Sequence, residues 1–316
     1  MHFRYSVVAW IMVALCINPS LQAAESTAGK QVRVISYNVQ FLPGIAALAN
    51  RRGQPTYRAQ AIGKQLAQYD IIGLNELFEA KPREQILAEI EQVWGKDYFS
   101  LFSPKLRPDR FTGGLAIISR YPFLETNIHT YTQSSSPEKY GLLADGYATK
   151  GILHARIALS SDQKDSSAVD VFVTHLEARE PAIRPSQYAE FAQFLKQHSS
   201  PERPAVLMGD FNTRGGQEEM SDARSAYNQM TKGFQQARPE SVLIDLWPAI
   251  GQGPGGTSDQ SDQDGGRRID YIFALNPKSG SPQLKPRSVQ VNRFLDPQVV
   301  ALSDHSAVES LFDWLP

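Results

Sequence analysis

Cysteine is nearly absent from this sequence of 316 residues. The single cysteine, Cys16, lies within the first 23 residues, so the remainder of the chain has no thiol. Disulfide bonds are therefore excluded from residues 24–316. Folding must rest on the hydrophobic core, for which 41% hydrophobic residues are ample material.

A hydrophobic run long enough to span a membrane is also missing from the N-terminal region. Residues 7–17 form an uncharged apolar run of eleven, well short of the ~20 residues that a membrane span needs. Arg4 precedes the run, and Pro19 and Ala23 follow it. This pattern predicts a signal peptide over residues 1–23, cleaved after Ala23, rather than a membrane anchor. We therefore expect a secreted or periplasmic protein.

An excess of charge of one sign is lacking as well. Without residues 1–23 the chain has 31 basic and 33 acidic residues, a formal charge of −2. A dedicated DNA-binding protein would usually be more basic, so the balance argues mildly against nucleic acid as the substrate.

Strand-like and helix-like patterns alternate along residues 24–316 with no repeat and no linker, which predicts one domain. Apolar stretches predict strands at 32–39, 70–76, 115–119, 151–159, 169–175, 205–208, 268–275 and 306–311. Helical spacing appears at 57–68, 82–94 and 187–196. We expect an α/β fold in which two sheets pack face to face with flanking helices. Residues 251–266 predict a flexible loop beside the functional site.

Two short polar segments carry the strongest chemical signal. The segment Gly209-Asp210-Phe211-Asn212 follows a predicted strand and places a carboxylate and an amide on the same side. In Ser303-Asp304-His305-Ser306 an acid stands beside an imidazole. Together they supply the groups that metal-assisted hydrolysis of a phosphate ester needs. Taken alone, the first segment is more typical of a turn.

Two further strand ends offer side chains that suit a metal or a phosphate. Glu76 and Asn38 each end an apolar strand, and their oxygen atoms suit a hard ion such as Mg²⁺; the alternative is a pairing of Glu76 with a surface lysine or arginine. His175 ends another strand, where an imidazolium could neutralise phosphate charge. The alternative for His175 is a capping role with a backbone hydrogen bond.

Asp270 lies within an apolar strand, where an acid is costly to bury without a partner. His305 is the best candidate partner, and a salt bridge to Arg267 or Arg268 is the alternative. His129 and His154 have no acidic neighbour in the sequence and are interpreted as structural.

The order of these blocks resembles the endonuclease/exonuclease/phosphatase superfamily. The resemblance spans about residues 32–312 and rests on Ser36-Tyr37-Asn38-Val39, Leu74-Asn75-Glu76, Gly113-Gly114-Leu115-Ala116-Ile117-Ile118-Ser119-Arg120, Thr174-His175-Leu176, Gly209-Asp210-Phe211-Asn212, Arg268-Ile269-Asp270-Tyr271 and Ser303-Asp304-His305. It implies a four-layer α/β-sandwich and the chemistry of a divalent-metal phosphoesterase.

Within that superfamily the chain looks most like the neutral, bacterial-type sphingomyelinases. This resemblance rests on two segments, Thr174-His175-Leu176-Glu177-Ala178 and Ala148-Thr149-Lys150-Gly151. This resemblance implies a phospholipid or another phosphodiester as substrate, with peripheral contact to a membrane. We expect a monomer.

The resemblance also implies roles for the matching residues. Glu76 would bind Mg²⁺, or alternatively Mn²⁺ or Co²⁺, with Asn38 beside it. His305 would be the general base, oriented by Asp270. The remaining implied roles are that Asp304 orients His305 or touches the metal, that Asp210 and Asn212 position the nucleophile and the phosphate oxygens, and that His175 holds the phosphoryl group.

Two other functions stay open at this point. An exported nuclease with the same centre would need a basic cleft, to which Arg51, Arg52, Lys105, Arg107 and Arg110 could contribute. A non-catalytic binding protein on the same fold is the third hypothesis.

Overall fold

The computed structural model describes residues 30–44, 53–106, 108–141, 144–160, 167–258, 266–280 and 282–316. The expected signal peptide over residues 1–23 lies outside this range, as do residues 259–265 of the predicted flexible loop at 251–266. Within the described residues, no helix has both the length and the apolar character needed to cross a membrane.

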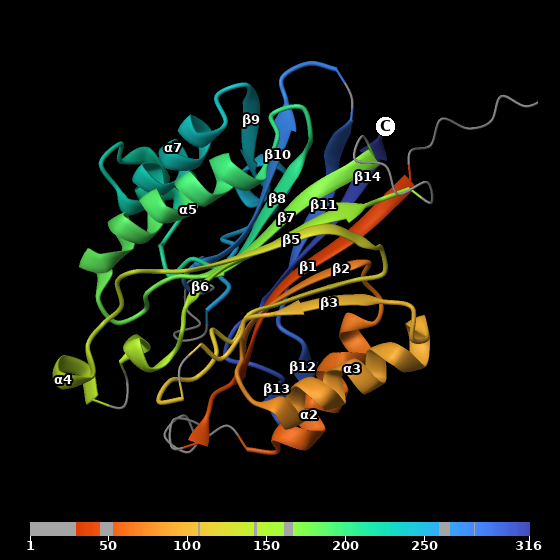
Figure 1. The fold of residues 1–316 in the computed structure, drawn as a ribbon, viewed down its shortest axis with the longest axis vertical. Coiled ribbons are helices and arrows are strands. Elements are labelled where there is room, and N and C mark those ends of the chain that lie inside the picture. Colours follow the sequence, from red (N-terminus) through yellow and green to blue (C-terminus); the bar gives the residue numbers. More distant parts are fainter. Residues whose placement is uncertain are drawn as a thin grey trace, which may run out of the picture.

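Two six-stranded mixed sheets form the centre of the molecule (Figure 1). The first has the order β11-β14-β1-β2-β4-β3, from β11 (Gln283–Asn292), β14 (Ala307–Leu315), β1 (Lys30–Phe41), β2 (Ile71–Leu77), β4 (Ala116–Ser119) and β3 (Phe99–Phe102). The second has the order β5-β6-β7-β8-β10-β9, from β5 (Phe123–Thr130), β6 (Gly151–Ala158), β7 (Ala168–His175), β8 (Ala205–Asp210), β10 (Asp270–Pro277) and β9 (Ser241–Asp245).

Helices cover the outer face of each sheet, which makes four layers. The first sheet carries α2 (Pro55–Leu66) and α3 (Ala80–Trp94), and the second carries α5 (Arg184–His198) and α7 (Ala226–Ala237). The shorter elements are α4 (Pro137–Tyr140), η2 (Asp145–Tyr147), η4 (Pro181–Ile183), α6 (Gln217–Ser221), α8 (Leu246–Ile250) and the small pair β12 (Leu295–Asp296) and β13 (Val300–Ala301).

The core has three apolar layers, and the central strands contribute to two of them at once. Val34 packs between the sheets, whereas its neighbour Ile35 packs under α2 and α3. Val171 likewise faces the space between the sheets and Phe172 faces α5. A strand covered on both faces has apolar residues at nearly every position, which is why these strands read as continuous apolar runs in the sequence. The predicted four-layer sandwich is confirmed.

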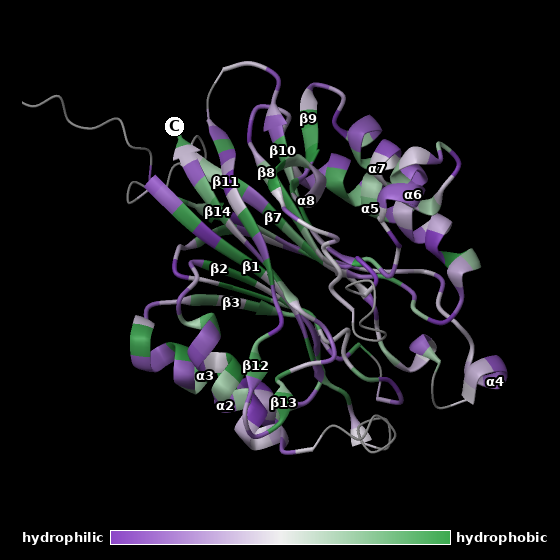
Figure 2. Cartoon of the chain, turned by 180° about the vertical axis from the view of Figure 1, so that it is seen from behind, coloured by the Kyte–Doolittle hydropathy of each residue, from purple (hydrophilic) through white to green (hydrophobic). Residues whose placement is uncertain are grey.

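The sheet topology determines where the functional side chains meet. The only parallel neighbours among the described strands of the two six-stranded sheets are β1 with β2 and β7 with β8. Parallel strands bring their carboxyl ends to one edge of a sheet. Because β10 and β14 run antiparallel to β8 and β1, they begin at that same edge. Figure 2 shows the loops that gather at this end of the two sheets.

Several elements were not predicted from the sequence. These are β3, β5, β9, β11, the small pair β12–β13, α7 and the short helical segments.

Candidate active site

Side chains from six strand ends converge on the carboxylate of Asp210. The Asn38 amide Nδ2 donates to Asp210 Oδ2 across the two sheets, at 3.1 Å. His175 Nε2 lies 3.5 Å and His305 Nε2 lies 3.9 Å from the same oxygen. Asp210 is 2% exposed, so these contacts are shielded from bulk water. The sequence predicted that these residues share one site, and the structure brings them together.

Glu76 reaches the same cluster from the end of β2. Its Oε1 lies 4.0 Å from His175 Nε2, and oxygen or nitrogen atoms of Glu76, His175 and Asp210 lie within 4.8 Å of one another. The alternative pairing of Glu76 with a surface cation does not appear among its described ion pairs. Burial, together with the charges of Asp304 and Asp210, raises the pKa of Glu76 to about 7.

His305 and Asp270 form an oriented pair. His305 Nδ1 lies 2.8 Å from Asp270 Oδ2, which leaves Nε2 facing Asp210. Burial opposes protonation of His305, but Asp270 outweighs it and raises the pKa of His305 well above its usual value. The alternative partner Arg268 instead pairs with Asp245, at 2.8 Å. Asp270 is therefore the hydrogen-bond partner that the sequence predicted for this histidine.

Asp304 lies beside this pair but turns away from its ring. Its carboxylate accepts a hydrogen bond from the Gln40 amide and a second one, at 3.3 Å, from Ser303 Oγ. The same Ser303 hydroxyl donates to the backbone carbonyl of Asn38, at 2.6 Å. Asp304 thus joins the segment before β14 to the end of β1, and it adds negative charge near Glu76.

Lys150 is the main site residue that sequence reasoning left without a role. Its ammonium group is buried and contacts His175 Nε2 at 3.0 Å, Asp145 Oδ2 at 2.7 Å and the Leu176 carbonyl at 2.8 Å. Although burial opposes ionisation of Asp145, the charge of Lys150 and a hydrogen bond from the Ala178 backbone N–H hold its pKa at about 2. The sequence did offer a signal for Lys150: it directly precedes the apolar strand β6. It also belongs to the segment Ala148-Thr149-Lys150-Gly151, which resembles the bacterial-type sphingomyelinases.

The surroundings of His175 do not favour the imidazolium that the sequence suggested. Burial, and then the positive charge of Lys150, lower the pKa of His175 well below its usual value. These surroundings favour the neutral ring, and Lys150 lies beside it as a buried basic side chain.

Asn212 is fixed by two hydrogen bonds beside Asp210. Its backbone N–H donates to Asp210 Oδ1 at 2.9 Å, and its side-chain Nδ2 donates to the Leu176 carbonyl at 3.0 Å. The amide therefore lies beside Asp210, where the sequence placed it.

Three residues at this edge have left-handed backbone conformations although none is glycine. The φ angles are 49° at Gln40, 58° at Glu76 and 46° at Asn212. Such conformations cost of order 1–3 kcal/mol each and cluster at functional sites. Here they turn the ends of β1, β2 and β8 toward the shared centre.

The residues present fit a divalent cation. Burial and the neighbouring Asp270 raise the pKa of Asp210 to about 6, so two nearby acids, Glu76 and Asp210, both resist ionisation. A dication at this cluster would offset that repulsion. Carboxylates with an adjacent amide are suitable ligands for a hard ion.

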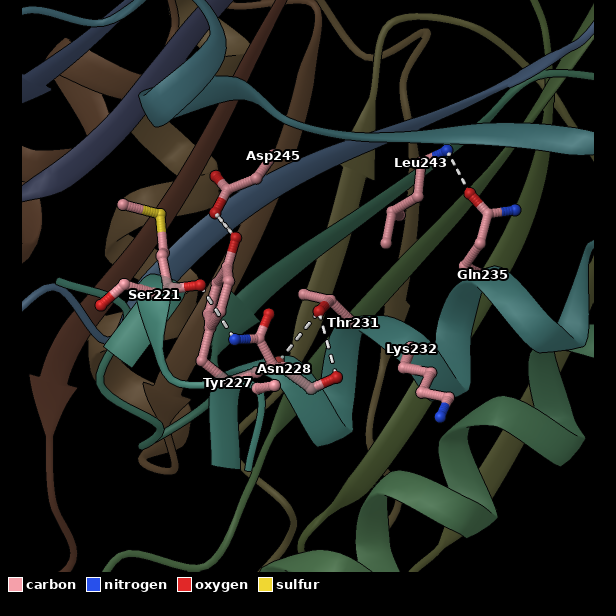
Figure 3. Close-up of a pocket in the computed structure, with 10 residues that line it drawn as sticks. Ser221, Tyr227, Asn228, Thr231, Lys232, Gln235, Leu243 and Asp245 are labelled. Atoms are coloured by element: carbon pink, nitrogen blue, oxygen red, sulfur yellow. Dashed lines mark hydrogen bonds between the residues drawn. The ribbon is translucent and has the colours of Figure 1, made fainter. Parts of the chain in front are cut away.

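A cavity of about 640 Å³ lies elsewhere, against α6, α7 and β9. It is lined by Tyr227, Asn228 and Lys232 among others, and Figure 3 shows the Tyr227 hydroxyl donating to Asp245. None of its lining residues belongs to the Asp210 cluster. Several of the polar groups drawn there bond to one another, and the groove lies apart from the Asp210 cluster.

Two histidines interpreted as having no acidic neighbour do have one in space. His129 Nε2 lies 2.7 Å from Glu190, and His154 Nε2 lies 3.1 Å from Asp170. Glu190 lies on α5 and Asp170 on the neighbouring strand β7, so neither acid is adjacent to its histidine in the sequence.

The basic residues considered for a nucleic-acid cleft are only partly described. Lys105 is exposed and Arg110 is half-buried beside Asp109. Arg51, Arg52 and Arg107 lie outside the described residues.

Comparison with known proteins identifies one family model over most of the chain. The model of the Endonuclease/Exonuclease/phosphatase family matches residues 35–305. A sphingomyelinase of Dictyostelium discoideum is 33% identical over 120 residues, which is 36% of this chain and 25% of that protein. Sphingomyelinase C of Bacillus cereus is 26% identical over 218 residues, or 62% of this chain and 61% of that protein. The matches thus span between a quarter and about three fifths of these relatives.

Solved structures share the fold over nearly the whole chain. A beta toxin variant from Staphylococcus aureus with bound magnesium ions has a TM-score of 0.61 at 18% identity, covering 89% of this chain and 99% of that one. Sphingomyelinase C from Streptomyces griseocarneus has a TM-score of 0.62 at 16% identity, covering 89% and 99%. TDP2 from D. rerio, complexed with a single-stranded DNA product, has a TM-score of 0.60 at 18% identity, covering 89% and 98%.

Proposed function

The chain belongs to the Endonuclease/Exonuclease/phosphatase family, and we propose that it is an exported, Mg²⁺-dependent phosphodiesterase that hydrolyses the headgroup of a sphingomyelin-like phospholipid. The observation that supports the proposal best is the Asp270–His305 pair. It directs His305 Nε2 toward Asp210, whose carboxylate also lies close to Glu76. The curated relatives named as sphingomyelinases support the lipid substrate.

His305 has the geometry of a general base. Asp270 accepts a hydrogen bond from Nδ1–H, so the lone pair of the neutral ring is on Nε2. That nitrogen takes the proton of the attacking water, and Asp270 stabilises the imidazolium that forms. Asp210 and Asn212 orient the water and the phosphate. His305 must be neutral before it can act, so its raised pKa sets the lower pH limit of turnover.

The phosphoryl group is held on the other side of Asp210. His175 lies there with its Nε2 accepting a hydrogen bond from the Lys150 ammonium, and Lys150 provides positive charge as negative charge develops on the phosphate oxygens. Glu76, with Asn38 beside it, would hold the divalent ion, which when bound neutralises phosphate charge and stabilises the leaving oxygen.

Exposed apolar side chains at the same end of the sheets support a membrane substrate. Leu295 is 76% and Val300 is 79% exposed, on the small pair β12–β13 that follows β11. Because β11 runs in the same direction as β1, this pair emerges at the edge that holds the site. In Figure 2 β13 is coloured as hydrophobic, whereas β12 combines an apolar residue with Asp296. Leu106 and Phe111, exposed on the loop that leads into β4, lie at this edge as well.

A substrate panel tests the proposal. The protein without residues 1–23 is incubated with Mg²⁺ and sphingomyelin vesicles, plasmid DNA or a small chromogenic phosphodiester. Release of phosphocholine from the vesicles supports the proposal. Nicked plasmid without phosphocholine release assigns the nuclease function instead, and no turnover with Mg²⁺, Mn²⁺ or Co²⁺ leaves a non-catalytic binding protein.

A paired substitution separates membrane contact from chemistry. Leu295→Ser with Val300→Ser removes apolar area worth ~1.5–3 kcal/mol per fully buried side chain, so vesicle hydrolysis should fall about tenfold or more. Hydrolysis of the small phosphodiester should not change. Val93→Ser is the matched control, since Val93 is 63% exposed on α3. Equal vesicle rates for the paired variant and this control would contradict peripheral contact through β12–β13.

A further inference from the structure

We propose a second metal site, outside the Asp210 cluster, that binds a transition-metal dication such as Zn²⁺ through Glu125, His154 and His198. One oxygen or nitrogen atom of each of these residues lies within 4.8 Å of those of the other two. The residues come from β5, β6 and the last position of α5. None of them takes part in the chemistry proposed above.

The position of His154 resembles a ligand held by an outer carboxylate. Its Nε2 lies 3.1 Å from Asp170, which is fully buried, and its Nδ1 lies 3.2 Å from the amide Nδ2 of Asn127. The amide donates, so Nδ1 has the lone pair and Nε2–H donates to Asp170. Histidine ligands of metals commonly donate their other ring N–H to a carboxylate in this way.

The Asn127 amide marks the position that a cation would take. The same Nδ2 donates to Glu125 Oε1 at 2.8 Å and to His154 Nδ1 at 3.2 Å, so it lies between two atoms with lone pairs. Rotation of this amide would turn its oxygen toward the cation and add a fourth ligand. Tetrahedral bonds of about 2.0–2.1 Å require ligand atoms roughly 3.3 Å apart, so side-chain adjustments of an ångström or so close the site.

The ligand types select the class of ion. Two imidazoles and one carboxylate suit Zn²⁺ and its neighbours, whereas Mg²⁺ and Ca²⁺ prefer oxygen ligands. Burial, and then the neighbouring His154, lower the pKa of His198, which favours the neutral ring that metal binding needs. Glu125 and His198 are only half-buried, so an ion can enter from solvent.

Arg156 is the competing cation. It pairs with Glu125 and, through Nε at 3.1 Å, with Asp170. A metal ion must displace the first of these contacts, and the side chain is 18% exposed and so has access to solvent. Binding would join the end of α5 to β5, which is an edge strand of the second sheet. Its expected consequence is stabilisation of the fold, with phosphodiester hydrolysis unchanged.

Calorimetric titration with Zn²⁺ in the presence of saturating Mg²⁺ tests the site. The variants are His198→Asn and Glu125→Gln, with the metal-free melting temperature of each confirming that it folds. The matched control is His129→Gln, since His129 lies on β5 and pairs with Glu190 of α5 outside the cluster. Glu76→Gln separates this binding event from zinc bound at the active site.

The proposal predicts a zinc-binding event that persists in Glu76→Gln and His129→Gln. In His198→Asn and Glu125→Gln the affinity should fall at least about tenfold. Bound Co²⁺ should give the optical spectrum of a tetrahedral site in the wild type and lose it in His198→Asn. Absence of this event from the wild type, its loss in Glu76→Gln, or an unchanged affinity in both cluster variants would overturn the assignment.

Discussion

Replacement of Asp270 by asparagine isolates the contribution of the orienting acid to catalysis. The substitution keeps the shape of the side chain but removes the negative charge 2.8 Å from His305 Nδ1. Two effects follow from the structure. The imidazolium that forms during turnover loses its charged partner, and the resting pKa of His305 falls because Asp270 is the main cause of its elevation.

The magnitude comes from the single hydrogen bond that is weakened. A hydrogen bond to a charged group contributes about 1.5–3 kcal/mol. Each increase of about 1.36 kcal/mol in the activation free energy slows the reaction tenfold. We therefore expect kcat to fall roughly 10- to 150-fold at the pH optimum. The active form of His305 is neutral, so the rate rises with pH through its pKa. Lowering that pKa in Asp270→Asn shifts the rising limb of the profile to lower pH.

The assay is the pH dependence of kcat on a small chromogenic phosphodiester with saturating Mg²⁺. His305→Ala with and without Asp270→Asn completes a double-mutant cycle, in which the second change should have almost no further effect. A slower variant with an unshifted profile, or additive losses in the cycle, would refute the assignment of Asp270 to His305.

Four further outcomes follow from particular contacts. Glu76→Ala should weaken Mg²⁺ binding at the active site, and calorimetry showing an unchanged affinity would remove Glu76 from the ligand set. Lys150→Met should raise the pKa of His175, because Lys150 is one cause of its depression, and should slow turnover roughly 10²-fold; histidine NMR titration and steady-state kinetics measure the two effects. Arg58 donates to the carbonyls of Val39, Gln40 and Leu302, so Arg58→Lys, which keeps the charge but loses about two of these bonds at ~1.5 kcal/mol each, should cost ~3 kcal/mol in urea unfolding. Gly209 has φ 136° and a Cβ there would lie 2.0 Å from the Thr174 carbonyl, so Gly209→Ala should lower stability by ~3 kcal/mol or more in thermal unfolding, and a variant as stable as the wild type would contradict the packing of β8 on β7.

The central strands could be predicted because burial on both faces leaves a continuous apolar run. The edge strand β5 could not, since Leu124 and Ile128 are exposed and three consecutive polar residues separate them. β11 contains Pro286, which is unusual inside a strand and coincides with a register shift. α7 buries Tyr227, Met230 and Phe234 at helical spacing, but its other residues are mostly polar, so the signal was missed.

The composition of the site was more predictable than its electrostatics. Polar residues at the ends of β1, β2, β7 and β8 stood out against apolar strands, and parallel topology brings such ends together. The lowered pKa of His175 results from burial and then from the neighbouring Lys150, a contact between residues 25 positions apart that no spacing in the sequence indicates. The kinks at Gln40, Glu76 and Asn212 likewise have no sequence signature. The metal and catalytic roles of the individual residues stay predictions.

Turnover of a small chromogenic phosphodiester by the wild type and by His305→Gln, each with Mg²⁺ and after its chelation, tests the proposed centre most directly. The account predicts hydrolysis by the wild type only with the metal, and a rate lower by ~10² or more in the variant at saturating Mg²⁺. A chelated wild type that keeps its rate, or a His305→Gln protein as fast as the wild type, would contradict it.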